Sequence, residues 1–153
     1  MRKNFDLNQF LPYLLNQAAE VTSTEFQGSY RDHGLSRAEW RVMANLGAHH
    51  TLTAAEICRI TFSDKTKVSR AVQGLAEAGL LRRSLVAGDR RRESLSLTDA
   101  GRILCRQIEH GALDFDAALR AALGPERAEA LALCLRDLID MGQAKGQAGG
   151  QGK

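Results

Sequence analysis

A chain of 153 residues is long enough for one core of ordinary size and too short for two comfortable domains. Its 44% hydrophobic content and its mixture of both charge signs exclude an intrinsically disordered protein, and no apolar run is long enough to cross a bilayer. The three cysteines, Cys58, Cys105 and Cys134, are odd in number and widely spaced, which argues against a disulfide framework. These features predict a cytoplasmic protein.

The net charge of +3 is unevenly distributed along the chain. Between Arg59 and Arg92 nine basic residues stand against three acidic ones, so this segment carries +6 and the remainder carries −3. A basic segment inside an otherwise acidic chain is typical of a protein that binds a polyanion. A merely solvated surface would spread both signs more evenly.

The first predicted helix lies near the N-terminus. Apolar residues recur at helical spacing from Leu7 to Val21, and Pro12 fits the first turn of the main helix, where its missing N–H costs little. This helix carries a long apolar stripe that needs a surface to cover it.

Two further helices are predicted by their start signals. Ser36 is followed three residues later by Glu39, and Thr53 is followed in the same way by Glu56. In each pair the hydroxyl and the carboxylate can satisfy backbone N–H groups that the first turn of a helix leaves free. The sequence therefore predicts one helix after Ser36 and another after Thr53.

The ends of these two helices are less sharply marked. We expect the first to end near Leu46, with Gly47 as its stop, and the second near Ile60. The adjacent His49 and His50 then suit a loop. Because the chain has no CxxC motif and no pair of histidines four residues apart, we expect no metal site and no cofactor.

The next predicted helix begins at Ser63 and ends at Gly79, after a three-residue turn. Val68, Ala71, Val72 and Leu75 share one face, and Gly79 suits a left-handed helix end. The opposite face displays polar side chains that can donate to phosphates, and two of them, Arg70 and Gln73, can reach base edges in a major groove. A helix of this kind is expected to read DNA.

A β-hairpin is predicted directly after this helix, from residues 81–86 and 93–97. Gly88 and Asp89 provide turn chemistry, so the arginines 90–92 lie at or near the tip. A ribbon tipped with arginines suits a narrow minor groove, where the negative potential is enhanced. Asp89 is expected to position a neighbouring guanidinium through a bidentate pair.

Two more helices are predicted in the C-terminal third. Thr98 caps the first, Gly124 stops it, and Pro125 opens the second. From residue 142 onward glycine and glutamine dominate, and we expect a disordered tail. The apolar stripes of the terminal helices are explained either by a larger monomeric core or by pairing between two subunits.

Residues 63–102 resemble the MarR family of bacterial transcription regulators. Their sequence is SDKTKVSRAVQGLAEAGLLRRSLVAGDRRRESLSLTDAGR, in which a helix ends at a glycine and an Asp-x-Arg element, Asp89 to Arg91, leads into Leu-Thr and a small residue plus glycine. The segment LSRAEWRVMANLG upstream is also similar to this family. The resemblance implies a winged helix-turn-helix, mainly α with a small β-wing.

The resemblance also implies a division of the chain and a mode of binding. Residues 1–34 and 99–141 would supply dimerisation helices, residues 35–98 the DNA-binding domain, and residues 142–153 the disordered tail. Arg91 would be the minor-groove arginine, and two copies would bind double-stranded DNA at a pseudo-palindromic operator as a repressor. The residues expected to contact DNA are Ser63, Asp64, Lys65, Thr66, Lys67, Ser69, Arg70, Gln73, Arg90, Arg91 and Arg92.

Members of this family commonly respond to small aromatic or anionic ligands, in a cleft between the dimerisation helices and the DNA-reading lobe. An aromatic carboxylate or its thioester is therefore the expected effector. The residues expected to line the cleft are Tyr13, Gln17, Trp40, Arg41 and Met43. The alternative for Tyr13, Trp40 and Met43 is simple core packing.

Other function classes are disfavoured by the sequence. No GxSxG, P-loop, HExxH or GxGxxG pattern is present, so an enzyme is not expected. Two alternatives stay open: a protein-binding winged-helix adaptor, and a redox- or metal-responsive regulator on the same scaffold. Cys58 lies in the first helix of the predicted reading motif, and we interpret it as a small buried hydrophobe rather than a redox switch.

Overall fold

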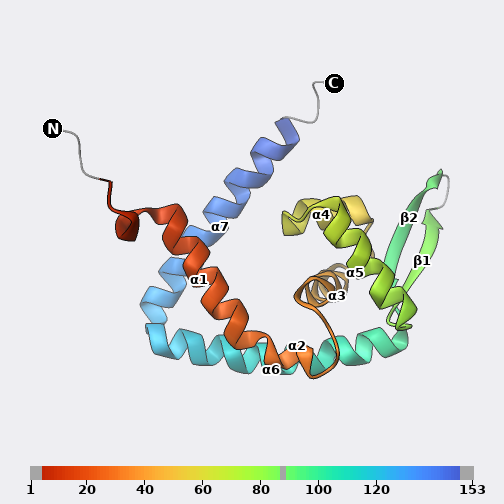
Figure 1. The fold of residues 1–153 in the computed structure, drawn as a ribbon, viewed down its shortest axis with the longest axis horizontal. Helices are drawn as coiled ribbons and strands as arrows, with labels where there is room; N and C mark the ends of the chain where they lie inside the picture. The colour runs from red at the N-terminus through yellow and green to blue at the C-terminus, as the bar shows by residue number, and fades with distance from the viewer. Residues whose placement is uncertain (1–4, 87–88, 149–153) are drawn as a thin grey trace.

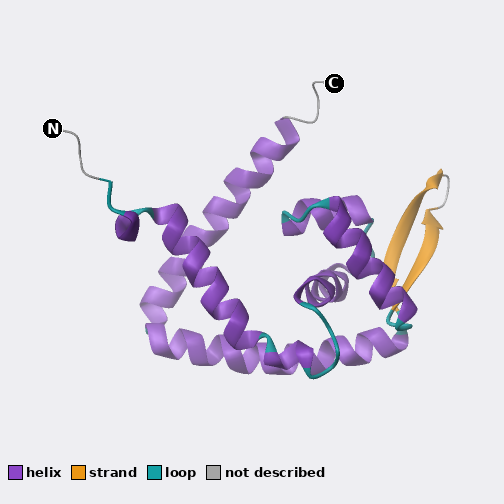
Figure 2. Cartoon of the chain, viewed as in Figure 1, coloured by secondary structure: helices purple, strands orange, loops and turns teal. Residues whose placement is uncertain are grey.

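The computed structural model describes residues 5–86 and 89–148, with side chains described for 5–85 and 93–144. The architecture is mainly α-helical with one small antiparallel sheet, as predicted (Figures 1 and 2). In chain order the elements are η1 (Leu7–Gln9), α1 (Leu11–Phe26), α2 (Gly28–Arg31), α3 (Arg37–His49), α4 (Ala54–Thr61), α5 (Lys65–Glu77), β1 (Leu81–Val86), β2 (Asp89–Leu97), α6 (Asp99–Leu123) and α7 (Pro125–Ala148). Within these ranges no helix is long and apolar enough to span a membrane.

Both predicted capping boxes are confirmed. The Glu39 carboxylate accepts from the Ser36 N–H at 2.8 Å, and the Ser36 hydroxyl accepts from the Glu39 N–H at 3.3 Å. The corresponding distances for Thr53 and Glu56 are 2.7 and 3.2 Å. Each pair satisfies backbone donors that would otherwise lack a partner, which fixes where α3 and α4 begin.

The expected end of α3 at Leu46 was wrong, because the helix continues to His49. Gly47 is therefore not its stop, and His49 does not lie in a loop. A Cβ at Gly47 would lie 2.9 Å from the Sγ of Cys105 on α6, so glycine at this position lets the two helices approach closely. The helix ends instead at His50, whose φ is 62°.

The start of α5 also differs from the prediction. Asp64, rather than Ser63, is the N-cap, and its carboxylate accepts from the Lys67 N–H at 2.8 Å. The end of the helix is as predicted. Gly79 has a φ of 70°, its N–H donates to the Ala76 carbonyl and the Leu80 N–H donates to the Leu75 carbonyl, which is the Schellman arrangement.

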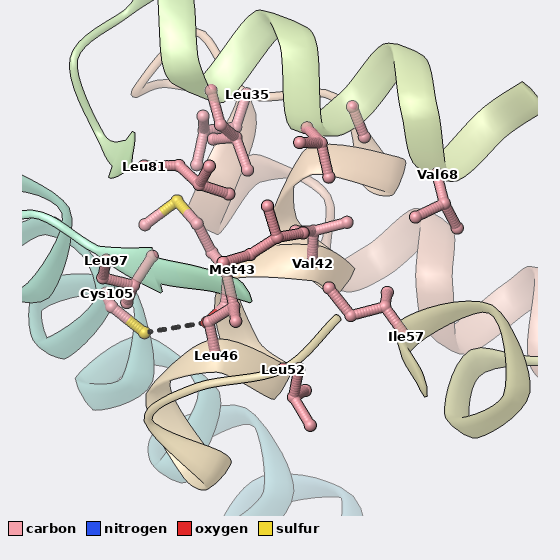
Figure 3. Packing of buried hydrophobic residues seen from close by; sticks show 14 of the residues in the cluster. Leu35, Val42, Met43, Leu46, Leu52, Ile57, Val68, Leu81, Leu97 and Cys105 are labelled. Atoms are coloured by element: carbon pink, nitrogen blue, oxygen red, sulfur yellow. Dashed lines mark hydrogen bonds between the residues drawn. The ribbon is translucent and has the colours of Figure 1, made fainter. Parts of the chain in front are cut away.

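The hydrophobic core lies among α3, α4, α5, the sheet and the first turns of α6. Figure 3 shows the Met43, Leu46 and Ile57 side chains in one cluster with Leu81 and Cys105. The four apolar residues predicted on the inner face of α5, from Val68 to Leu75, are all buried. This packing holds the outer face of α5 in a fixed orientation.

The two strands pair antiparallel, with Leu81 opposite Leu97 and Leu85 opposite Glu93. Leu52, in the connection between α3 and α4, forms an isolated bridge with Leu95 through two backbone hydrogen bonds of 3.1 and 2.7 Å. The base of the hairpin is thereby tied to the segment that precedes α4.

The end of the hairpin joins α6 through a close backbone contact. Thr98 caps α6 by accepting from the Gly101 N–H at 3.1 Å, and its own hydroxyl donates to the Gly79 carbonyl at 2.7 Å. Its N–H donates to the Leu80 carbonyl at 3.0 Å. A Cβ at Gly101 would collide with that same Leu80 oxygen, so the junction requires glycine.

Helices α1 and α7 lie at the side of the molecule away from the sheet (Figure 1). Figure 1 shows α6 running along one edge, from the sheet to the start of α7. Pro12 lies in the first turn of α1, as predicted, and Gly124 ends α6 with a φ of 84°. The disordered tail expected from residue 142 was wrong for residues 142–148, which continue α7; residues 149–153 lie outside the described range.

Candidate nucleic-acid interface

The outer face of α5 is open to solvent. Lys65, Thr66, Ser69 and Arg70 are all exposed, on the side of the helix opposite the buried Val68 to Leu75 face. Ser63 precedes the helix, is half-buried, and directs its hydroxyl to the Thr61 carbonyl at 3.4 Å. The exposed side chains from Lys65 to Arg70 present donors over one continuous helical face.

Two residues at the start of α5 are engaged with one another. The Asp64 carboxylate accepts from the Lys67 backbone and lies 3.3 Å from the Lys67 ammonium. The backbone hydrogen bond from Lys67 holds the pKa of Asp64 below its ordinary value. Asp64 therefore shapes the start of the helix, and Lys67 is the member of this pair with a charge suited to phosphate.

Gln73, predicted as a base-reading residue, belongs to a network that the sequence did not reveal. Its side-chain oxygen accepts from Arg83 of β1 at 3.1 Å, and its amide nitrogen donates to Glu77 at 2.6 Å. Arg83 also donates to Glu93 of β2 at 3.2 Å. The network braces the C-terminal half of α5 against the hairpin. Arg83 and Glu93 are diagonal neighbours in the observed register, which the two predicted strand ranges did not specify.

The hairpin is longer than predicted, since β2 begins at Asp89 rather than Glu93. Val86 pairs with Asp89 and Leu85 with Glu93, so the three arginines between them fall in an irregular part of the ladder. Such bulges bend a strand and increase its twist. The side chains of Asp89, Arg90, Arg91 and Arg92 lie outside the described residues.

A cavity of about 420 Å³ lies between α1, α2 and α3. Phe26, Tyr30 and Trp40 form its aromatic part, with ring centroids 5.8 to 6.4 Å apart. Arg37 and Arg41 add two guanidinium groups. We call this space, lined by these five residues together with Ala19 and Ser23, the aromatic cavity. Its size and its combination of apolar surface with a few charged groups are typical of small-molecule sites.

Of the five predicted ligand residues, Trp40 and Arg41 line the aromatic cavity. Met43 does not, because it is fully buried in the core. Tyr13 and Gln17 lie nearer the start of α1 and are not part of the lining. Phe26, Tyr30 and Arg37 were missed; the spacing of Phe26 and Tyr30, four residues apart, was the available signal.

The three cysteines differ in exposure. Cys58 is half-buried, Cys134 is exposed, and Cys105 is buried with its thiol 3.3 Å from Glu109. Burial, together with the hydrogen bond and charge of Glu109, raises the pKa of Cys105 to about 12. Its thiol is therefore protonated at neutral pH, which is unsuited to redox sensing. Across the part of the chain that the structure describes, no three histidine, cysteine or acidic side chains gather as a metal site.

Comparisons with known proteins agree with this arrangement. The MarR family model matches residues 33–92. Among solved structures, a MarR family transcriptional regulator from Silicibacter pomeroyi is 28% identical, with a TM-score of 0.79 over 90% of this chain and 98% of the other. Among curated proteins, none matches the sequence.

Two further structures share the fold at 23% identity. BpsR of Bordetella bronchiseptica, whose DNA binding is regulated by 6-hydroxynicotinic acid, has a TM-score of 0.80 over 90% of this chain and 99% of its own. NadR, solved in complex with 4-hydroxyphenylacetate, has a TM-score of 0.76 over 91% of this chain and 96% of its own.

Proposed function

The chain belongs to the MarR family of transcription regulators, and on this premise we propose that it is a sequence-specific repressor that binds double-stranded DNA as a homodimer. The observation that carries the proposal is the exposed polar face of α5 from Lys65 to Arg70, held by a complete core beside a hairpin that contains three consecutive arginines. In this proposal α5 enters the major groove and the hairpin reaches the adjacent minor groove.

The dimer is supported by the apolar surface of the terminal helices. Leu11, Leu14 and Val21 on α1 and Leu138 and Ile139 on α7 are exposed in the single chain. A cavity of about 520 Å³ with an almost wholly apolar lining lies between α1, α6 and α7. A second copy would cover these surfaces and, with two-fold symmetry, place two α5 helices about 34 to 36 Å apart for successive half-sites.

DNA binding is tested by selecting the operator from a random pool at moderate salt and measuring its affinity against salt concentration. If the protein contacts phosphates, its DNA affinity should fall by roughly 0.9 log units per log unit of salt for each neutralised phosphate.

Arg70→Ala should cost about 1 to 3 kcal/mol of operator binding and relax the sequence preference at one position, whereas Lys65→Ala should weaken binding to all sequences alike. Unchanged operator affinity in Arg91→Ala would show that the hairpin assignment is wrong. No sequence enrichment at all would favour the adaptor instead.

We further propose that a small aromatic carboxylate, or its thioester, binds in the aromatic cavity and releases the operator. The three aromatic rings of the cavity suit the aromatic ring of such a molecule, and the two arginines suit its carboxylate. BpsR and NadR, which share the fold, are described with aromatic carboxylic acids. The test is a panel of benzoate, 6-hydroxynicotinate and 4-hydroxyphenylacetate, with benzamide as the uncharged control. A panel that neither raises the melting temperature nor releases operator DNA rejects this part of the proposal.

A further inference from the structure

Arg37 and Arg41 lie between two cavities. Both line the aromatic cavity, and both line a second cavity of about 540 Å³ that opens at the turn before α5. The second cavity also reaches Thr61, Asp64 and Lys67. One helix face of α3 therefore separates the proposed effector site from the start of the DNA-reading helix.

The two arginines have different partners. Arg37 bonds to α1, donating to Glu20 at 3.1 Å and to the Ser23 hydroxyl at 2.8 Å. Arg41 bonds to the helix-turn-helix, with its Nη2 donating to the Thr61 carbonyl at 2.8 Å in a partly buried hydrogen bond. Arg41 alone of the pair thus connects the aromatic cavity to the DNA-reading motif.

A hydrogen bond to the Thr61 carbonyl can affect the direction of α5, because this carbonyl lies in the turn that leads to the helix. Thr61 is the last residue of α4, where carbonyls lack the usual intrahelical donor. The next residue, Phe62, adopts the left-handed conformation with a φ of 50°, and only Ser63 and the cap Asp64 separate it from α5. The Thr61 carbonyl also accepts from the Ser63 hydroxyl at 3.4 Å, so the Arg41 bond is the shorter of two side-chain bonds that hold the turn before α5.

We propose that an anionic effector acts through Arg41, by drawing its guanidinium from the Thr61 carbonyl to the carboxylate in the aromatic cavity. A carboxylate adds a full negative charge and can pair with the planar guanidinium through two parallel hydrogen bonds, so it competes with a peptide carbonyl for the same donor. The turn before α5 then loses its support, and operator affinity falls. This inference rests on the proposed function, because it supplies the differential interaction that a switch needs.

The test compares Arg41→Met with Arg37→Met in the full chain, with the selected operator and with 4-hydroxyphenylacetate, 6-hydroxynicotinate and benzoate as probes. Arg41→Met should bind operator about tenfold more weakly without any probe and lose no further affinity when a probe is added. Arg37→Met removes a guanidinium from the same cavity but no bond to Thr61, so it should lose less operator affinity than Arg41→Met and should require more probe for release. Hydrogen exchange at residues 61–65 should rise in wild type with probe and in Arg41→Met without it.

Arg41→Lys tests whether Arg41→Met loses operator affinity because the bond to Thr61 is missing or because the protein misfolds. It keeps a charged donor that can reach a carbonyl, so it should restore part of the operator affinity lost in Arg41→Met. Arg41→Met that binds operator like wild type overturns the link to the turn. Arg41→Met that is weakened yet still released by a probe overturns the competition.

Failure of the proposed function itself gives a different result. If wild type enriches no operator, the DNA-binding proposal fails before any variant is compared. If wild type binds operator but none of the three carboxylates releases it, the effector proposal fails and this inference fails with it.

Discussion

The segment proposed to read DNA differs from helices α1 and α7 in how far its apolar residues are buried. From Leu35 to Leu97 most large apolar side chains converge on one core, with Phe62 and Leu85 as exposed exceptions. Met43, Ile57 and Leu75 are fully buried. On α1 no residue is buried, and Ala128 is the only buried hydrophobic residue in the described part of α7. The first region buries its core within one chain, whereas α1 and α7 leave a large apolar surface exposed to solvent.

Helices α1 and α7 are therefore the region that the proposed second copy would stabilise. A complete core fixes the orientation of α5 whether or not a second copy is present. The exposed faces of α1 and α7 gain most of their hydrophobic stabilisation only when another surface covers them. Substitutions in the two regions should therefore change different equilibria, which gives a direct way to test the comparison.

The largest effect is expected at the junction of the two regions. Gly101→Ala places a Cβ against the Leu80 carbonyl, a backbone group that cannot rotate away, and should lower the free energy of unfolding by about 3 kcal/mol. Gly111→Ala, on the same helix with only ordinary contacts to Ser29, should instead raise stability by about 0.5 to 1 kcal/mol. Denaturant unfolding measures both. Equal behaviour of the two variants would show that the junction is not a close-packed point.

The next effect concerns the terminal helices. Leu138→Glu buries a charge in the proposed dimer interface and should weaken dimerisation by about 2 to 3 kcal/mol. Sedimentation equilibrium measures the dissociation constant. Ala130→Glu introduces the same charge at another exposed position of α7 and serves as the control. A Leu138→Glu protein that remains as dimeric as wild type would contradict the use of this face for pairing.

A smaller effect is expected at Arg83, which connects the hairpin to α5. Arg83→Leu removes the contacts to Gln73 and Glu93, which are solvent-exposed and worth about 0.5 kcal/mol, and should lower operator affinity roughly two- to threefold. Arg82→Leu removes an equal charge from the neighbouring residue, whose bond is to Ser96 instead. Fluorescence anisotropy at matched salt compares them. Equal losses would mean that charge, and not the brace, sets the affinity.

The smallest effect is a pH dependence at the start of α5. The pKa of Asp64 lies below its ordinary value of 3.8, so its stabilising contribution is present above pH 3.8 and is lost as the pH falls through the lower, folded-state value. Asp64→Asn keeps a side-chain cap that does not titrate. Wild type should therefore lose more thermal stability than Asp64→Asn between about pH 6 and about pH 3. Parallel losses in the two proteins would contradict this role.

Features that depend on neighbours in the sequence were predictable. The capping boxes at Ser36 and Thr53, the glycine end of α5 at Gly79 and the position of Pro12 all follow from residues within one or two helical turns. The inner face of α5 followed from its periodicity in the same way. Local hydrogen-bonding needs and local spacing are both present in the sequence itself.

Features that depend on residues far apart in the sequence were not predictable. Gly47 was interpreted as a stop because its close contact with Cys105 on α6 cannot be seen locally. The Arg41 bond to Thr61 joins two helices across a turn. Composition alone also misplaced the tail, because adding residues to an existing helix costs far less than nucleating one, and α7 continues into the glycine-rich segment.

Because of the contact between Gly101 and Leu80, a rotation of α6 would move α5 and the hairpin with it. At this point Thr98 joins the end of α5 to the start of α6, with its N–H donating to the Leu80 carbonyl and its hydroxyl donating to the Gly79 carbonyl. The contact between Gly101 and Leu80 leaves no room for a Cβ. The helix has 25 residues and is about 37 Å long. If α6 rotated by about 5° about its C-terminal end, α5 and the hairpin at its N-terminal end would move together by about 3 Å. Since neighbouring bases are about 3.4 Å apart along each strand, such a tilt in the proposed dimer would shift α5 and the hairpin by nearly one base pair along the DNA.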